Sequence, residues 1–421
     1  MVFLNLALKS LKNRSLASIL TVISIALSVI LLLSVERAKR AAEEGFTQTI
    51  SQTDLIVGAR SGPTQLILYT VFNMGNATHN ISYQTYQDIQ KNPAIEWTIP
   101  YSLGDGHRGF RVVGTTNDFF EHYRFRGDRR VELQEGKPLE GLWDVVIGSD
   151  VARKLNYKLG EKIVVAHGVT HGEGIQKHDD KPFTVTGIMK PTGTALDQSL
   201  YVSLEGIEAM HIDWKDGAAP TPQTAIGADK IRKEDIKIDQ ITAFFLRTKS
   251  RIDTLRLQRE INNYKEEPLL AIIPGVTLSE LWHGLSYVEQ VLKAISWMVV
   301  AVGFMAMLIA LTTSLNERRR EMAILRALGA STSKIIALLV FESTLLTFMG
   351  IVLGTVISVA GTALLRPWLE TEFGFYLEGG ALGKTELMYL AATLVGGILI
   401  GLIPARRAQQ MALKDGLSVK I

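Results

Sequence analysis

Four long runs of apolar residues divide the chain, and a long, more polar stretch separates the first run from the second. The runs extend from Leu16 to Val35, Ile295 to Leu315, Ile335 to Leu365 and Leu387 to Pro404. An α-helix rises about 1.5 Å per residue, so runs of this length can cross a hydrocarbon core about 30 Å thick. The pattern predicts four membrane-spanning helices, with both termini on the same side of the membrane.

The distribution of basic residues predicts which side that is. The segment after the second run and the tail after the fourth are rich in Arg and Lys, whereas the segment between the third and fourth has only Arg366 and Lys384. Basic segments next to membrane helices are usually cytoplasmic. We therefore expect both termini in the cytoplasm and the insert between Glu36 and Ala294 outside, because long inserts translocate largely regardless of their charge.

The residue pattern of the insert predicts an α+β domain. Good helix formers from Glu36 to Ile50, and apolar residues repeating every three to four positions from Leu278 to Ile295, predict stalk helices that extend the first and second spans. Between them, β-rich runs such as Val145 to Ile147 and Phe183 to Met189 alternate with helical patterns. We expect two subdomains. The apolar stretch from Leu66 to Phe72 is interpreted as a buried strand or as an exposed contact surface.

Two features of the predicted membrane helices concern their packing. Gly350 and Gly354 in the third span, and Gly397 and Gly401 in the fourth, have the four-residue spacing that lets helix backbones approach closely in lipid. Packing within the bundle and a dimer seam both fit this spacing. Glu342 is an ionisable residue inside the third span, so it is either functional or structural, reaching the interface or a neighbouring helix.

Composition narrows the chemistry that the chain can carry. The net charge is +3 with the basic residues scattered, which argues against a nucleic-acid partner. The chain has no cysteine, which excludes disulfides, thiolate metal ligands and a thiol nucleophile. Any metal must therefore be bound by histidines and carboxylates.

All eight histidines lie in the insert, and three of them lie close together in one predicted loop. His167, His171, His178 and the adjacent Asp179 offer donors suited to zinc. Their spacing matches no standard zinc motif, so a solvated polar loop is the alternative. A membrane-tethered metalloenzyme is disfavoured, because the sequence lacks a rigid His-Glu-x-x-His pair.

Four sequence segments carry a resemblance to a known family. They are Asn5-Leu-Ala-Leu-Lys-Ser-Leu11; Val146-Ile-Gly-Ser-Asp-Val-Ala-Arg-Lys-Leu155 with Phe183-Thr-Val-Thr-Gly-Ile188; Glu317-Arg-Arg-Arg-Glu-Met-Ala-Ile-Leu-Arg-Ala-Leu-Gly-Ala-Ser331; and Pro404-Ala-Arg-Arg-Ala408. In order and place they resemble the MacB/FtsX-type permeases of bacterial ABC transporters. The match covers essentially the whole chain.

The resemblance implies a layout for the chain in a bacterial inner membrane. The implied segments are a cytoplasmic amphipathic helix at 1–15, spans at 16–35, 295–315, 335–365 and 387–404, an extracytoplasmic domain at 36–294, a cytoplasmic coupling helix at 316–334, an outer loop at 366–386 and a cytoplasmic tail at 405–421. Both termini would be cytoplasmic.

The coupling helix would dock on a separate ATPase. Its amphipathic pattern gives polar contacts and an apolar face, and the residues expected to contact the ATPase are Glu317, Arg318, Arg320, Glu321, Met322, Leu325, Arg326 and Leu328. The chain itself is not expected to bind ATP, because Gly383-Lys384-Thr385 has Glu378 where a phosphate-binding loop needs glycine. The resemblance implies two ATPase copies, a second permease as homodimer or heterodimer, and transmission of ATP-driven movement to the outer domain.

The sequence leaves more than one cargo possible. Gly58-Ala-Arg-Ser-Gly-Pro63, Lys181-Pro-Phe-Thr-Val-Thr-Gly187 and Pro191-Thr-Gly-Thr194 are similar to a branch linked to zinc acquisition, which implies zinc or a zinc-carrying partner as cargo. The alternatives are export or extraction of a lipoprotein, peptide or drug, and FtsX-like regulation of a cell-wall hydrolase. Partners outside the membrane would be an adaptor, a lipoprotein or a metal-binding protein, and lipid would surround the spans.

Overall fold

The computed structural model describes residues 15–166, 178–214, 224, 226–284, 286–317, 330–373 and 382–415. The chain divides into two compact units. The membrane unit comprises the chain up to Ala41, Ser286–Pro367 and Leu377–Ile421. The inserted domain comprises Ala42–Leu285 and Trp368–Tyr376.

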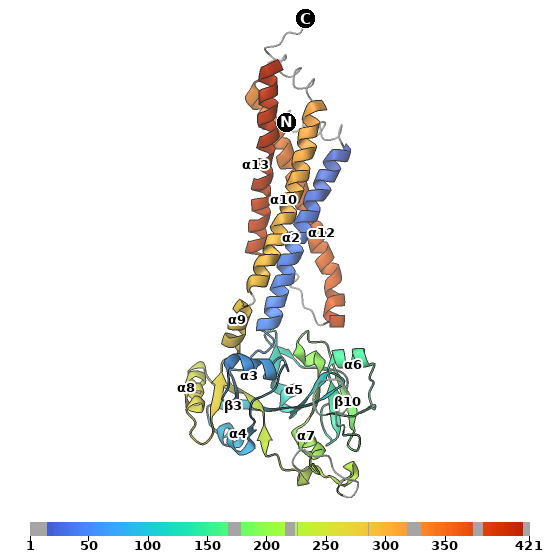
Figure 1. The fold of residues 1–421 in the computed structure, drawn as a ribbon, viewed down its shortest axis with the longest axis vertical. Coiled ribbons are helices and arrows are strands. Elements are labelled where there is room, and N and C mark those ends of the chain that lie inside the picture. Colours follow the sequence, from blue (N-terminus) through green and yellow to red (C-terminus); the bar gives the residue numbers. More distant parts are fainter. Residues whose placement is uncertain are drawn as a thin grey trace. The chain divides into compact units, whose positions relative to one another are not determined.

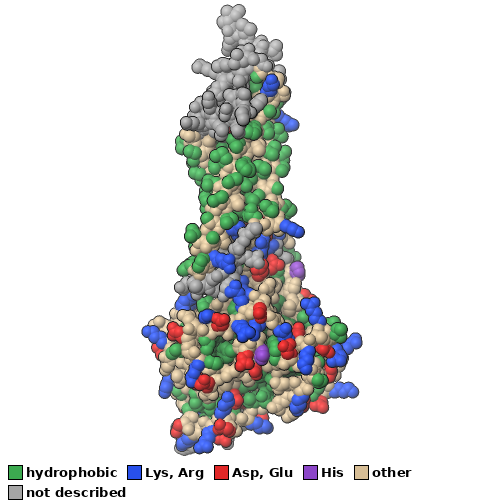
Figure 2. All heavy atoms as spheres, turned by 180° about the vertical axis from the view of Figure 1, so that it is seen from behind, with side chains coloured by type: hydrophobic (Ala, Val, Ile, Leu, Met, Phe, Trp, Pro, Cys, Tyr) green, Lys and Arg blue, Asp and Glu red, His purple; other side chains and the backbone are tan. Residues whose placement is uncertain are grey.

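The membrane unit is a bundle of four long helices (Figure 1). They are α2 (Ser15–Thr47), α10 (Ser286–Glu317), α12 (Thr332–Phe373) and α13 (Lys384–Asp415). Within the described residues, these four are long and apolar enough to cross a membrane. Large apolar side chains such as Leu27, Met298 and Leu364 are exposed on them, and Figure 2 shows hydrophobic side chains spread over the bundle surface. Such a surface is suited to lipid, and the predicted architecture of four membrane helices is confirmed.

Both glycine pairs lie where helices of the bundle touch. A Cβ atom built on Gly354 would lie 2.7 Å from the carbonyl oxygen of Ala26 in α2, and one on Gly350 would lie 2.6 Å from a side-chain carbon of Ile25. Cβ atoms on Gly397 and Gly401 would clash with the α12 side chains of Thr347 and Ser343. The spacing therefore serves packing within the bundle, where small residues allow backbones to approach.

Two membrane helices extend beyond their apolar runs. The predicted outer loop at 366–386 is helical at both ends, because α12 continues to Phe373 and α13 begins at Lys384. A proline inside a helix removes one backbone hydrogen bond, and Pro367 lies inside α12 without ending it. The division between the two units falls at this proline. The predicted N-terminal helix at 1–15 lies almost entirely outside the described residues, which begin at Ser15.

The inserted domain is built on one mixed sheet with helices on both faces (Figure 1). Its strands are β1 (Leu55–Ala59), β2 (Ile81–Ser82), β3 (Ile95–His107), β4 (Phe110–Thr115), β5 (Arg124–Phe125), β6 (Arg129–Arg130), β7 (Leu133–Gly136), β8 (Asp144–Ile147), β9 (Lys162–Ile163), β10 (Phe183–Met189), β11 (Ser199–Ser203), β12 (Gln240–Ile241), β13 (Ala243–Thr248) and β14 (Leu269–Ile272). Its helices are α3 (Pro63–Thr70), α4 (Tyr83–Gln90), α5 (Asp118–His122), α6 (Ser149–Leu155), α7 (Leu204–Met210), α8 (Arg251–Asn262) and α9 (Pro274–Gly284), with 3-10 turns at Ala195–Gln198, Ala228–Lys230 and Lys233–Asp235.

The large sheet has the strand order β14-β1-β13-β3-β4-β11-β8-β10-β7, with β9 paired to β10. The long strand β3 pairs with β13 along its first part and with β4 along its second part. Backbone hydrogen bonds therefore continue from one half of the domain to the other. The prediction of an α+β domain is confirmed, and its division into two subdomains stays a prediction.

The core lies on both faces of this sheet. Successive residues of a strand point to opposite faces, and Phe244 and Phe245 of β13 accordingly belong to different hydrophobic clusters. On one face, Phe245 shares a cluster with Leu66 of α3. On the other, Phe244 shares a cluster with Leu257 of α8. The strands are therefore buried on both sides, as expected for a sheet covered by helices.

The apolar stretch from Leu66 to Phe72 is buried, but the expectation of a strand is wrong. Its residues form α3, in which Leu66, Ile67 and Tyr69 are buried. Pro63 stands at the start of this helix, directly after Gly62. Proline at the first helical position is preorganised for a helix, and a short apolar run cannot by itself distinguish a buried helix from a buried strand.

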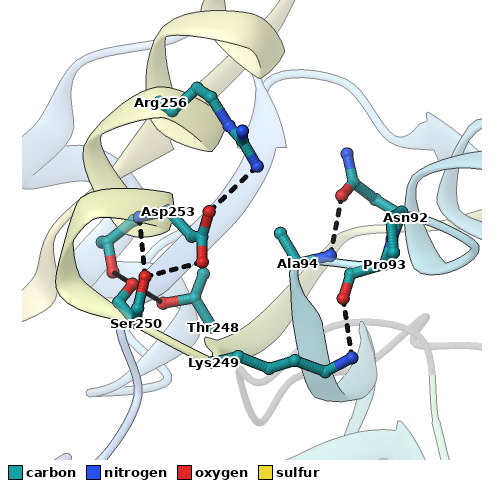
Figure 3. Close-up of polar contacts among 9 residues, drawn as sticks. Asn92, Pro93, Ala94, Thr248, Lys249, Ser250, Asp253 and Arg256 are labelled. Atoms are coloured by element: carbon teal, nitrogen blue, oxygen red, sulfur yellow. Dashed lines mark hydrogen bonds and ion pairs between the residues drawn. The ribbon is translucent and has the colours of Figure 1, made fainter.

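Local sequence also fixes where α8 begins (Figure 3). The Ser250 hydroxyl accepts a hydrogen bond from the Asp253 N–H at 3.2 Å, and Arg256 pairs with the Asp253 carboxylate at 2.9 Å. The neighbouring Lys249 donates to the carbonyl of Pro93 at 2.7 Å. A serine cap followed three residues later by an acidic residue stabilises the first turn of a helix, and the lysine attaches this turn to the segment before β3.

Candidate functional site

The predicted ATPase-coupling segment is bracketed by two described helices. Helix α10 ends at Glu317, whose side chain is not described, and α12 begins at Thr332. The other predicted contact residues, namely Arg318, Arg320, Glu321, Met322, Leu325, Arg326 and Leu328, lie outside the described residues. Their role stays a prediction.

Glu342 lies in the buried part of the membrane unit. Its relative exposure is 4%, and the neighbouring Ser343 and Thr347 are fully buried. The Thr347 hydroxyl lies 3.5 Å from the sulfur of Met307 in α10. Glu342 therefore faces the inside of the bundle rather than the lipid, which is where ionisable residues of membrane helices are usually found.

A second polar cluster of the membrane unit joins three helices. The Arg37 guanidinium of α2 donates to the Glu386 carboxylate of α13 at 2.9 Å, with the two side chains only 12% and 2% exposed. Arg37 also donates to Thr362 Oγ1 of α12 at 2.8 Å, and Glu386 accepts the Gly383 N–H at 2.6 Å. This cluster was not predicted, because its residues are far apart in the sequence. The sequence gives the order of residues but does not show which distant ones come together.

The structure describes two of the four predicted metal ligands. His167 and His171 lie outside the described residues. His178 is fully buried, whereas the adjacent Asp179 is exposed. Among the described residues, His178 instead lies with Asp105 and His211, and one ligand atom from each lies within 4.8 Å of the others.

The geometry of this group is compact. The Asp105 Oδ2 atom lies 3.1 Å from His211 Nε2 and 3.5 Å from His178 Nε2. The Trp214 ring packs against the His178 ring, with 4.7 Å between their centroids. We call Asp105, His178 and His211 the His–Asp cluster.

Three separate elements position the cluster. Asp105 lies where the register of β3 against β4 shifts between Leu103 and Gly106, and such irregularities turn a side chain away from the regular alternation. The backbone N–H of His178 donates a hydrogen bond to the Val165 carbonyl oxygen at 2.9 Å, which holds this residue in place. His211 directly follows α7 as its C-terminal cap residue.

A buried ion pair ties two of these elements together. The Lys181 ammonium donates to the Asp213 carboxylate at 2.6 Å, and both side chains are almost fully buried. Burial by itself would raise the pKa of Asp213, but hydrogen bonds from the Ile226 N–H and from Lys181 outweigh it and lower this pKa. The pair fixes the segment after His178 against the segment after His211.

The electrostatics of the cluster favour positive charge. Burial by itself would lower the pKa of His211, but the hydrogen bond and charge of Asp105, with the Ile207 carbonyl and Glu208, raise it above its usual value. The His211 Nδ1 atom lies 3.0 Å from the Ile207 carbonyl oxygen. Neither Asp105 nor His211 was predicted, since each stands alone in the sequence without a recognisable spacing.

Together, four apolar helices and a large α+β domain inserted between the first and second define a multi-pass membrane protein. Comparison with protein families agrees. Residues 16–264 match the family described as MacB-like periplasmic core domain, and residues 293–412 match the one described as FtsX-like permease C-terminal. The chain belongs to the MacB/FtsX family of ABC transporter permeases.

Individual relatives cover smaller parts. A macrolide export ATP-binding/permease protein MacB of Marinobacter nauticus is 28% identical over 159 residues, which are 38% of this chain and 23% of that protein. MacB of Escherichia coli K12 is 32% identical over 127 residues, or 30% of this chain and 18% of that protein. An uncharacterized ABC transporter permease of Methanocaldococcus jannaschii is 25% identical over 291 residues, covering 68% of this chain and 65% of that protein.

Among solved structures, the extracellular domain of a noncanonic ABC-type transporter, YknZ, from Gram-positive bacteria is similar to 52% of this chain and 99% of its own chain. The sequence identity is 11% and the TM-score is 0.31, so this similarity adds nothing to the family assignment.

Proposed function

We propose that the chain is the permease subunit of an ABC transporter whose ATP is bound and hydrolysed by a separate cytoplasmic ATPase. The observation that carries this proposal is the match of residues 293–412 to the FtsX-like permease family, which includes the segment between α10, ending at Glu317, and α12, beginning at Thr332. Two ATPase copies and a second permease, identical or different, would complete the complex. The termini and the coupling segment would face the cytoplasm.

The proposed mechanism is transmission of movement from the ATPase side to the inserted domain. Helix α2 supports it, because its 33 residues span about 50 Å at about 1.5 Å per residue, well beyond a hydrocarbon core of about 30 Å. The helix begins in the membrane unit, and its last residues belong to the inserted domain. There Phe46 stacks on Phe72 and packs against Trp282 of α9. A continuous helix anchored in this way can carry movement between the two units.

For the cargo, we propose zinc or a zinc-carrying partner. The His–Asp cluster favours this choice, because two imidazoles and a carboxylate are common zinc ligands. Export of a lipoprotein, peptide or drug, and regulation of a cell-wall hydrolase, are the alternative functions, with an adaptor, a lipoprotein or a metal-binding protein as outer partner.

The ATPase partner can be tested by purification from native membranes. The wild-type chain should copurify an ATPase, and Arg318→Glu combined with Arg326→Glu should lose it. A matched control reverses two exposed lysines of the inserted domain, Lys158→Glu with Lys162→Glu, and should keep it. Equal recovery with both double variants would contradict the coupling role, and no ATPase with the wild type would contradict the partner itself.

Transmission through α2 predicts a different pattern. Ala38 is exposed on α2, close to where the helix passes between the units. Ala38→Pro should break the helix there and abolish ATP-dependent zinc transport, while ATP hydrolysis persists. Ala38→Ser is the control that keeps the helix intact. Transport at the wild-type rate in the proline variant would refute transmission through α2.

A further inference from the structure

We propose that Asp105, His178 and His211 bind one divalent transition metal ion, with Zn²⁺ the best match. The donor set comes from three elements that sequence spacing does not connect, and it shares His178 with the ligands suggested by the sequence. The site would exist whether or not zinc is the transported cargo, and its test needs neither ATP nor the ATPase.

The distances fit a tetrahedral zinc ion. Zinc binds imidazole nitrogen and carboxylate oxygen at about 2.0–2.2 Å, so two ligand atoms of one tetrahedral ion lie about 3.3–3.6 Å apart. The two measured separations are 3.1 Å for Asp105 Oδ2 to His211 Nε2 and 3.5 Å for Asp105 Oδ2 to His178 Nε2. Two of the three separations therefore match those around a tetrahedral ion, and the third lies within 4.8 Å.

The surroundings orient a ligand. Because the His211 Nδ1 atom faces the Ile207 carbonyl at 3.0 Å, its N–H donates there, and the lone pair of Nε2 can point to a metal beside Asp105. A backbone carbonyl on the second ring nitrogen is the usual support of a metal-binding histidine. The Asp105 carboxylate beside His211 supplies negative charge that attracts a cation.

The supporting structure is rigid where the ligands attach. The Gly106 N–H and carbonyl are both hydrogen-bonded to Ala166, with 2.9 Å between nitrogen and oxygen in each bond. The buried pair of Lys181 and Asp213 connects the elements that carry His178 and His211. Ligands held in place before the metal arrives make binding tighter, because less ordering accompanies it.

Three of the four ligands of a tetrahedral ion come from the described residues. The His178 side chain is fully buried, whereas those of Asp105 and His211 are 13% and 31% exposed.

A second group in the inserted domain serves as a comparison. Asp118, Glu121 and His122 also place ligand atoms within 4.8 Å of one another. Glu121 is exposed, and the His122 ring stacks on Trp97 with 5.4 Å between centroids and 9° between planes. Stacking stabilises this histidine by packing, and we expect no metal there.

The experiment is calorimetric titration of the full-length, detergent-solubilised chain with ZnCl₂ after treatment with a chelator. The wild type should bind one Zn²⁺ per chain, and His211→Ala and Asp105→Asn should each weaken binding at least about tenfold. His122→Ala and the double variant His167→Ala with His171→Ala should bind like the wild type. Thermal unfolding of each variant shows whether it folds. If one of the two cluster variants fails to fold, the other still tests the site.

The results decide between sites. Lack of zinc binding by the wild type, or wild-type binding by a folded His211→Ala or Asp105→Asn chain, would overturn the proposal. So would loss of binding in the loop double variant while the cluster variants still bind. Replacement of Zn²⁺ by Co²⁺ adds a spectroscopic check, because the visible absorption of a tetrahedral site should disappear in His211→Ala. Loss of zinc binding without loss of the copurified ATPase would leave the permease proposal intact.

Discussion

Gly354 offers the sharpest test of how the membrane unit packs. A Cβ atom at this position would lie 2.7 Å from the Ala26 carbonyl oxygen and 2.9 Å from the Val29 Cβ atom of α2. Ordinary contacts are about 3.3 Å to a carbonyl oxygen and at least about 3.5 Å between carbons. Gly354→Ala therefore forces α2 and α12 apart by about 0.6 Å at a point where backbone, not a flexible side chain, is in the way.

Gly361 provides a control in the same helix. A Cβ atom there has no heavy atom of the described residues within 4 Å, so Gly361→Ala brings a similar gain in helix propensity without the clash. Because overpacking typically costs about 1–3 kcal/mol, the free energy of unfolding of Gly354→Ala should be lower than that of Gly361→Ala by that amount. The assay is unfolding of the full-length chain in mixed micelles with increasing SDS, followed by tryptophan fluorescence. Equal stability of the two variants would refute close packing of α2 against α12 at this site.

Three further substitutions test buried polar contacts by thermal unfolding of the full-length chain. Lys181→Met should destabilise it by about 3–5 kcal/mol, because it leaves the Asp213 carboxylate buried without its cation, and wild-type stability would contradict the importance of this pair. Glu386→Met should destabilise the chain by a similar amount, because it removes the carboxylate that pairs with the Arg37 guanidinium. A double variant that also replaces Arg37 by Met should recover part of the lost stability. No recovery would argue against a direct pairing of the two residues. Asp197→Ala removes the acceptor of two backbone N–H groups at 2.7 and 2.9 Å and should cost about 1–3 kcal/mol for each, whereas a change below about 0.5 kcal/mol would show that water replaces it.

The sequence by itself determined the membrane architecture and most local structure. Apolar runs long enough to cross a bilayer, basic residues beside them and the periodicity of short segments are local properties, so they can be read without knowing the fold. Strands at Val145 to Ile147 and Phe183 to Met189 lie where their composition predicted. The four glycines indicated close packing, although not which helices would meet.

The tertiary structure decided everything that depends on residues distant in the chain. Arg37 and Glu386 are 349 residues apart, and no spacing rule connects them. The sequence indicated His178 because other histidines stand near it in the chain. Among the described residues, it lies with Asp105, from an irregular point of β3, and His211, at the end of α7. A metal site needs donors within a few ångströms, and only the path of the backbone through the sheet brings these three together.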